Sequence, residues 1–169
     1  LAVFFSAPGP EPDGRHGGSV HRILVVDGSY SMQAETSLEG DLRLTRWDEA
    51  KMGIGALLTQ WAEHDTWSLY FLGPTPGWVV QRAPVGNGDA LLAAIDSLRI
   101  GNHRAQLATC FADLATVCRG GGCAVYLFAD DQGTSWEGVA HTEAQLPRDT
   151  PFHWIGGELA SRHNLAVTE

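Results

Sequence analysis

The chain has 169 residues, of which 44% are hydrophobic and 18% are charged, so it is large enough for one globular domain with a sizeable core. This composition excludes an intrinsically disordered protein. The formal net charge is −9 and Lys51 is the only lysine, so the sequence lacks the basic tract that binding to nucleic acid or to an anionic membrane requires.

The N-terminal segment, residues 1–19, is not expected to be part of the domain. Residues 1–5 are wholly apolar, and a loop rich in Gly and Pro follows at residues 6–19. Because a membrane-spanning helix needs about 20 residues, residues 1–5 are either the end of such a helix or an edge strand. We therefore assign residues 1–19 to a linker, residues 20–163 to one domain, and residues 164–169 to the start of a further linker or domain.

An apolar run ends in an oxygen-rich turn early in that domain. Residues 20–27 predict a strand, and the unbroken apolar stretch within it is typical of burial on both faces. Asp27, Ser29 and Ser31 follow at alternate positions. Ligands of parallel sheets bind at the carboxyl ends of strands. One carboxylate and two hydroxyls there present hard oxygens to one point, which predicts a site for Mg²⁺ or Mn²⁺.

A helix is the next element that the sequence predicts. Residues 32–45 show no clear period and are expected to form a loop. Thr45 and Asp48 resemble a capping box at the start of a helix. Its apolar positions recur at helical spacing, so one face should cover the sheet: Trp47, Ala50, Ile54, Leu57, Leu58 and Trp61.

Two strands joined by a short turn should follow that helix. Residues 66–72 alternate and are rich in aromatic side chains, which is typical of a strand. The turn at residues 73–77 contains two Gly and two Pro, and it is too short for a crossover. The strand at residues 78–82 is therefore expected to run antiparallel at an edge of the sheet.

The remaining sequence alternates between helices and strands. Helices are predicted at residues 88–98 and 104–118, and a second continuous apolar run predicts a buried strand at residues 123–128. Residues 133–147 are polar and poorly periodic, and residues 151–156 predict a final strand. This order predicts a three-layer α/β/α, Rossmann-like domain, with a mostly parallel central sheet and one antiparallel edge strand.

Two of the buried strands end in acids, which completes the candidate site. Asp130 and Asp131 follow the later strand as Asp27 follows the first. If these strands lie side by side, one of the later acids joins Asp27 and the two serines around one point. We expect Asp130 to be the ligand and Asp131 to be its solvated neighbour. The alternative is that Asp and Ser occupy these turns only because they bond to their own backbone.

The sequence gives no comparable support for an enzyme. The cysteines have no metal-site or C-x-x-C spacing and are interpreted as small buried hydrophobic residues: Cys110, Cys118 and Cys123. The seven histidines are scattered and are interpreted as surface or satisfied residues. Neither a nucleophile elbow nor a phosphate-binding loop is present. An aspartyl-phosphate enzyme would place an Asp after a strand, but it usually needs a nearby lysine, and Lys51 is the only candidate.

The segment at residues 23–32 resembles the start of a von Willebrand factor type A (VWA) domain. In that family an Asp-x-Ser-x-Ser motif after the first strand forms the metal-ion-dependent adhesion site (MIDAS). Residues 46–51, 67–71 and 124–130 resemble further parts of the VWA fold. The resemblance implies that Asp27, Ser29, Ser31 and Asp130 hold Mg²⁺, or alternatively Mn²⁺ or Ca²⁺.

One MIDAS ligand of the family does not carry over to this sequence. Ala105 occupies the place where the family has a Thr, and Thr109 lies one helical turn further on, where it should face away from the site. The loss of this hydroxyl implies that metal binding is weakened, altered in geometry or absent.

A narrower resemblance connects the chain with bacterial BatA-like, aerotolerance-type membrane proteins. It rests on residues 27–32, 93–99 and 164–168. In that family two transmembrane helices precede the VWA domain, which would explain residues 1–5 as the stub of the second helix. The resemblance implies a membrane-anchored protein with its domain on the periplasmic or cell-surface side, where the membrane is reached only through segments outside this chain.

These observations lead to one main hypothesis and two alternatives. The main hypothesis is a non-enzymatic module that binds a protein partner, with a carboxylate of the partner completing the metal's coordination. The first alternative is a structural or scaffold domain with a vestigial, metal-free site. The second, less favoured, is an enzyme of the aspartyl-phosphate or hydrolase type.

Overall fold

The structure, a computed structural model, describes residues 18–37, 43–130, 139 and 146–156. Its main sheet has five strands in the spatial order β5-β4-β1-β6-β7, and only the β4–β5 pair is antiparallel. This arrangement confirms the expected fold class, including the antiparallel edge strand. The strands are β1 (His21–Asp27), β4 (Thr66–Leu72), β5 (Gly77–Pro84), β6 (Cys123–Phe128) and β7 (Phe152–Ile155).

Strand β1 lies at the centre of the sheet, which explains the unbroken apolar stretch at residues 23–26 within it. All seven of its residues are buried. It pairs in parallel with β4 on one side and with β6 on the other, so that His21 faces both Thr66 and Cys123. A parallel strand covered by helices on both faces is apolar at successive positions along its middle, and not only at alternate ones.

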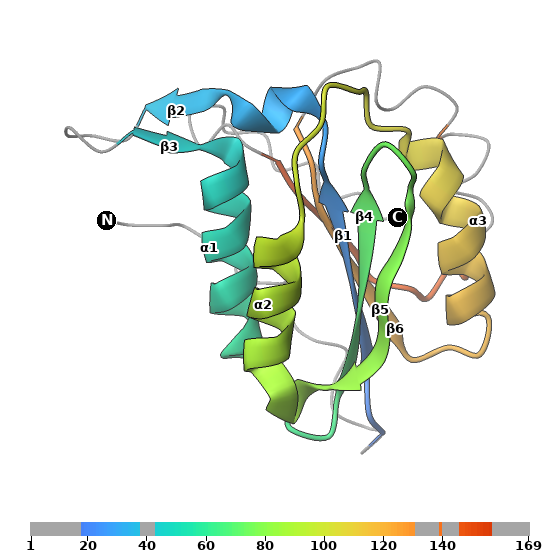
Figure 1. Cartoon of the computed structure of the whole chain (residues 1–169). Coiled ribbons are helices and arrows are strands. Elements are labelled where there is room, and N and C mark those ends of the chain that lie inside the picture. Colours follow the sequence, from blue (N-terminus) through green and yellow to red (C-terminus); the bar gives the residue numbers. More distant parts are fainter. Residues whose placement is uncertain (1–17, 38–42, 131–138, 140–145, 157–169) are drawn as a thin grey trace.

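Helices cover both faces of this sheet, as the three-layer prediction requires (Figure 1). Helices α1 (Arg46–Leu58) and α2 (Gly88–Ser97) lie on one face, and α3 (Leu107–Cys118) lies on the other. Because side chains alternate along a strand, β1 contributes to two cores. Leu24 and Val26 pack on the α1/α2 side, whereas Ile23 and Val25 pack on the α3 side.

The start of α1 is fixed by the predicted capping box. The Thr45 hydroxyl accepts a hydrogen bond from the backbone N–H of Asp48 at 3.1 Å, and Asp48 Oδ2 accepts one from the backbone N–H of Thr45 at 3.1 Å. The helix then approaches the sheet closely at Gly53, where a Cβ atom would lie 3.0 Å from Cε1 of Phe128. This contact leaves no room for a larger residue unless the ring moves.

Three predictions about local structure were wrong. Residues 32–45 are not a simple loop, because they contain the end of a 3₁₀ helix, η1 (Tyr30–Gln33), and two short strands. These strands, β2 (Glu35–Ser37) and β3 (Arg43–Thr45), form a small antiparallel sheet, and three residues are too few to show a period. Helix α3 begins at Leu107 and not at residue 104, and Trp61 packs in the core beyond the end of α1.

Other predictions are confirmed or lie outside the described residues. The three cysteines are buried and free, as expected. Residues 1–17 and 157–169, on which the two linker assignments rest, are outside the described part of the chain, as is most of the polar stretch at 133–147. Within the residues that the structure describes, no helix is long and apolar enough to cross a bilayer.

A buried polar cluster lies at the amino-terminal end of β1, opposite the candidate site. Arg22 donates from Nε to Oδ2 of Asp65 at 3.0 Å and from Nη1 to the hydroxyl of Tyr126 at 2.8 Å. The other oxygen of Asp65 accepts from the backbone N–H of Val20 at 2.8 Å. Both charged side chains are nearly inaccessible to solvent. This cluster joins β1 to β6 and to the start of β4.

His21 is buried beside this cluster, and its environment predicts a pH-dependent stability. Its ring nitrogens lie 2.8 Å from the Thr66 hydroxyl and 3.1 Å from the Ser68 hydroxyl. Burial, assisted by the positive charge of Arg82, lowers the pKa of His21 to about 4. Because this pKa is about 6.5 in the unfolded chain, unfolding takes up a proton between these values. Stability is therefore complete above pH 6.5 and falls as the pH drops towards 4.

We expect wild type to lose about 2 kcal/mol of unfolding free energy through His21 between pH 7 and pH 5. Urea denaturation at the two pH values measures this loss, and His21→Gln should remove most of it. His64→Gln, which replaces an exposed histidine, is the matched control and should retain the wild-type pH dependence. An unchanged pH dependence in His21→Gln would contradict the assignment.

Candidate functional site

The candidate site lies where the order of strands reverses. From β1 the chain proceeds through α1 to β4 on one side, and it later returns through α3 to β6 on the other. Crevices at such switch points, at the carboxyl ends of the strands, are the common ligand sites of open α/β sheets. Asp27 ends β1 and Asp130 follows β6, so both acids border this crevice, and neither is exposed to solvent.

Asp27 has one satisfied and one unsatisfied oxygen. Its Oδ1 accepts a hydrogen bond from the backbone N–H of Ser29 at 2.7 Å, while Oδ2 is buried without a hydrogen-bond partner. Burial raises the pKa of Asp27 above its ordinary value, and the negative charge of Asp130 adds to this effect. The hydrogen bonds from Ser29 and the charge of His103 act in the opposite direction. A buried carboxylate oxygen without a donor is costly, and a cation would relieve that cost.

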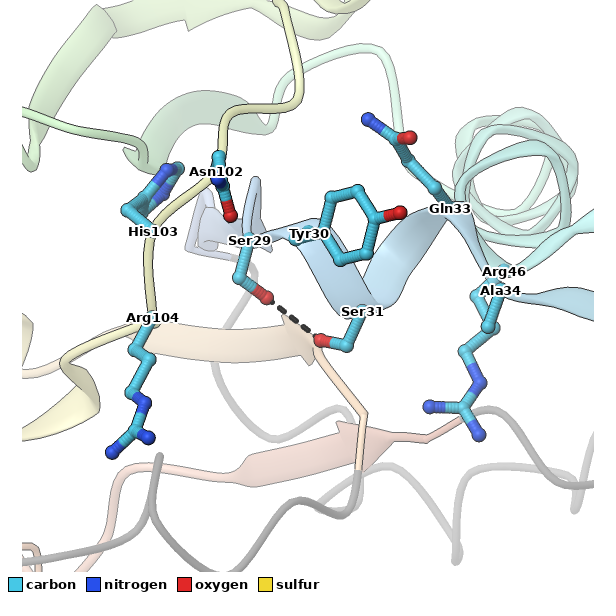
Figure 2. A pocket seen from close by; sticks show the side chains of 9 residues that line it. All are labelled: Ser29, Tyr30, Ser31, Gln33, Ala34, Arg46, Asn102, His103 and Arg104. Carbon is cyan, nitrogen blue, oxygen red and sulfur yellow. Dashed lines mark hydrogen bonds between the residues drawn. The ribbon is translucent and has the colours of Figure 1, made fainter.

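The two serines of the motif converge on each other. Ser29 precedes η1 and Ser31 lies within it, and their hydroxyl oxygens are 2.9 Å apart (Figure 2). Gly28 leaves room for the ring of Phe71, because a Cβ at that position would lie 2.2 Å from Cζ of Phe71 and would displace the ring. The structure thus places the three oxygen-bearing residues of the Asp-x-Ser-x-Ser turn close together, and their role as metal ligands stays a prediction.

Asp130 is held by an arginine that the sequence analysis did not assign to the site. Nη1 of Arg46 donates to Oδ2 of Asp130 at 3.2 Å, and the Arg46 side chain is 17% exposed. Arg46 is the first residue of α1, so the helix start positions its guanidinium group over the crevice. Asp131, the alternative acid, lies outside the described residues.

A loop from the other side of the sheet is joined to the motif. The backbone N–H of Gly101 donates to the carbonyl of Gly28 at 2.9 Å, and that of Tyr30 donates to the carbonyl of His103 at 3.4 Å. Nε2 of His103 lies 3.0 Å from the carbonyl of Leu72, so this nitrogen carries the proton. Nδ1 of the same ring is buried without a partner, so the interpretation of His103 as a satisfied residue holds for only one of its nitrogens.

The residues near the expected Thr position supply no hydroxyl to the site. Ala105 is 2% exposed and packs in the core beneath α3. The Thr109 hydroxyl donates to the carbonyl of Gln106 at 2.6 Å in an exposed position. Thr109 therefore does not replace the missing ligand.

A cavity of about 700 Å³ opens above these residues (Figure 2). Arg46 and Arg104 flank the pair of seryl hydroxyls, so the lining combines two cations with several neutral polar groups. The side chain of Tyr30 is 61% exposed at its edge. The lining residues are Ser29, Tyr30, Ser31, Gln33, Ala34, Arg46, Asn102, His103 and Arg104.

The donor set fits a hard divalent cation only in part. Asp27 Oδ2 is a buried, unpartnered anionic oxygen, and the two seryl hydroxyls lie beside it in the same turn. In the part of the chain that the structure describes, no three His, Cys, Asp or Glu side chains cluster as a metal site would require. A metal here would therefore depend on hydroxyls and water in addition to the two carboxylates.

Sequence reasoning missed the basic part of this site. Neither Arg46, within the stretch 46–51 that resembles part of the VWA fold, nor His103 and Arg104, next to Ala105, was predicted to line it. The sequence signal that pointed to these residues was the place of the loop between α2 and α3, where a VWA domain has a metal ligand. Neither motif spacing nor periodicity predicts that Arg46 reaches an acid 84 residues further along the chain.

Comparison with known proteins identifies the fold but not a family. The sequence matches no family model and no curated protein sequence. Two solved structures are similar: the conserved hypothetical protein BatB from Bacteroides thetaiotaomicron, with a TM-score of 0.64, and an aerotolerance-related membrane protein from Bacteroides fragilis, with a TM-score of 0.55. Each shares 16% sequence identity with this chain and covers 82% of it.

A third solved structure, the SpRpn10 VWA domain, covers 82% of this chain and 88% of its own length, with 11% identity and a TM-score of 0.47. The present chain spans 66% and 67% of the two Bacteroides structures, so they contain further regions that it does not match. The strand order and the first two similarities establish the fold that the sequence resemblance implied.

Proposed function

We propose that this chain, whose fold is VWA-like, is a non-enzymatic module that binds a protein partner at the crevice between β1 and β6. Asp27, Ser29, Ser31 and Asp130 would hold a divalent cation there, with Mg²⁺ as the first choice and Mn²⁺ or Ca²⁺ as alternatives. Bound in this way, the cation would offer its open coordination positions to an acidic side chain of the partner.

The unpartnered Oδ2 of Asp27 is the observation that carries this proposal. Folding buries this oxygen completely and leaves it without a donor, although most buried polar atoms in proteins are paired. It lies in the same turn as the two convergent seryl hydroxyls, beneath the open cavity. A purely structural turn would gain stability from a neutral residue at position 27, so the retained carboxylate supports a ligand role.

The cavity above the site supports an acidic partner group. Its two arginines provide a positive lining in a chain whose net charge is −9. The exposed ring of Tyr30 at the edge offers the kind of amphipathic contact that is enriched at protein interfaces. A partner could therefore place a carboxylate in the cavity and pack apolar surface against Tyr30.

The proposal extends to a larger bacterial protein anchored in a membrane, with this domain on the extracytoplasmic side. Residues 1–5 are apolar, and one structure that shares the fold is described as an aerotolerance-related membrane protein. Purification of the complete gene product with and without detergent, followed by protease accessibility in intact cells, tests the anchoring and the side of the membrane.

Metal-titrated thermal denaturation tests the proposed site. Under the main hypothesis, Mg²⁺ or Mn²⁺ at 100 times its dissociation constant should stabilise the wild type by about 2.7 kcal/mol, and EDTA should reverse this effect. Ser31→Ala should reduce the response because it removes a ligand hydroxyl. Ser97→Ala, which removes a hydroxyl that bonds only within exposed α2, is the matched control and should respond like wild type.

A scaffold domain with a vestigial site is the second candidate function. The Arg46–Asp130 ion pair and the apolar Ala105 both favour it. In that case no metal would raise the melting temperature of wild type, and Ala105→Thr, which restores a hydroxyl, could create a response in the variant alone. If neither protein responds to any of the three metals, the main hypothesis is wrong.

A further inference from the structure

Arg46 is a cation that the structure pairs with a candidate metal ligand, Asp130. Its Nη1 lies 3.2 Å from Oδ2 of Asp130, and the guanidinium group also lines the cavity. The candidate site thus contains two buried acids: Asp130 has Arg46 beside it, and Asp27 has an oxygen without a hydrogen-bond partner. This difference between the two acids is expected if the positive charge of Arg46 takes the place of part of the charge of a metal ion.

The backbone of Arg46 is fixed in this position from two directions. Its N–H donates to the carbonyl of Ala34 at 3.1 Å, which joins the start of α1 to the end of η1. The capping box of Thr45 and Asp48 holds the preceding turn. The long side chain therefore starts from an anchored point beside the serine turn, and its guanidinium group can move without any change in the fold.

A divalent cation that bound Oδ2 of Asp130 would meet this guanidinium group at the same oxygen. A metal bound to Asp130 would use the lone pairs to which Arg46 donates, and two cations at adjoining positions of a buried site repel each other strongly. Either the guanidinium group of Arg46 or a metal ion would neutralise the charge of Asp130, so the site can be stable with either one.

We propose that Arg46 is a tethered cation that competes with a divalent metal for Asp130, so that the Arg46–Asp130 pair and the metal-bound site are alternative states. This inference rests on the proposed function. It adds that Arg46 lowers the affinity of the site for metal, and that metal binding releases the guanidinium group of Arg46 from Asp130.

Isothermal titration calorimetry of the full chain with Mn²⁺ tests this competition. Arg46→Gln should bind Mn²⁺ at least about tenfold more tightly than wild type, since tenfold is the scale of a modest charge–charge interaction. Arg43→Gln is the matched control, because it removes an equal charge from an exposed pair with Glu35, and it should bind like wild type. Arg104→Gln removes a charge from the same cavity and should give a smaller gain.

A second measurement keeps the test valid if Arg46→Gln is unstable. In EDTA, Arg46→Gln should melt at a lower temperature than wild type because Asp130 loses a partner, and Mn²⁺ should restore more stability to the variant than to wild type. Arg46→Lys keeps a positive charge on a shorter side chain, so its affinity for Mn²⁺ should lie between those of wild type and Arg46→Gln.

The outcomes separate this inference from the proposed function. If wild type binds no Mn²⁺ and Arg46→Gln does, the competition is supported and the metal-dependent function of the native chain is wrong. If wild type binds and Arg46→Gln binds equally, the competition is overturned and the proposed function stands. If Arg46→Gln gains no more than Arg104→Gln, the effect is one of general charge and the competition is overturned. If no variant binds, both are overturned.

Discussion

Asp65→Ala is expected to destabilise the domain by about 3–5 kcal/mol, because it removes a buried carboxylate that forms an ion pair with the buried Arg22. Asp65 is 2% exposed, and its two oxygens accept from the backbone of Val20 and from Nε and Nη2 of Arg22. The guanidinium group also lies 5.9 Å from the ring centre of Trp61 and bonds to the hydroxyl of Tyr126.

Urea denaturation at pH 7 measures this loss. Asp96→Ala, which removes an exposed acid from α2, is the matched control and should change the free energy of unfolding by less than about 0.5 kcal/mol. Replacing both partners, as in Arg22→Met with Asp65→Leu, should recover much of the stability, because the cost comes mainly from the unpaired charge. A loss below about 1 kcal/mol in Asp65→Ala would show that Arg22 is neutralised by other groups.

The main elements were predictable because their signals are local. Strands β4 and β6 have the predicted bounds, and β1 differs by one residue, since buried parallel strands are continuous apolar runs. The start of α1 was predictable because a capping box lies within four consecutive residues. Strands β2 and β3 were missed because three residues carry no measurable period, and their pairing depends on contacts with each other.

Only the part of the candidate site that lies at the ends of the predicted strands could be predicted from the sequence. Asp27, Ser29 and Ser31 are adjacent in sequence, and Asp130 approaches them because β6 pairs with β1. The Arg46–Asp130 and Arg22–Asp65 pairs join residues 84 and 43 positions apart, and neither arginine stands in a recognisable pattern. Such pairs depend on the packed fold, so the acids could be predicted from the sequence, whereas their arginine partners are seen only in the structure.

A second large effect is expected from Asp27→Asn, which should stabilise the metal-free protein by about 1–3 kcal/mol. The amide can keep its oxygen as the acceptor for the Ser29 N–H, and an uncharged nitrogen takes the place of the unpartnered Oδ2. It also removes a buried negative charge that interacts with Asp130. Because burial raises the pKa of Asp27, the wild-type carboxyl is protonated more readily when folded, so the gain should be largest at neutral pH and shrink in acid.

The same substitution should abolish the response to metal, since a neutral amide is a much weaker ligand than a carboxylate. Urea denaturation in EDTA measures the gain in stability, and the melting temperature with and without Mn²⁺ measures the lost response. Asp96→Asn should change neither. A gain in stability together with a lost response to metal would show that the carboxylate at position 27 serves metal binding and not stability. If Asp27→Asn is less stable than wild type without metal, the carboxylate has a structural role and the main argument for the site fails.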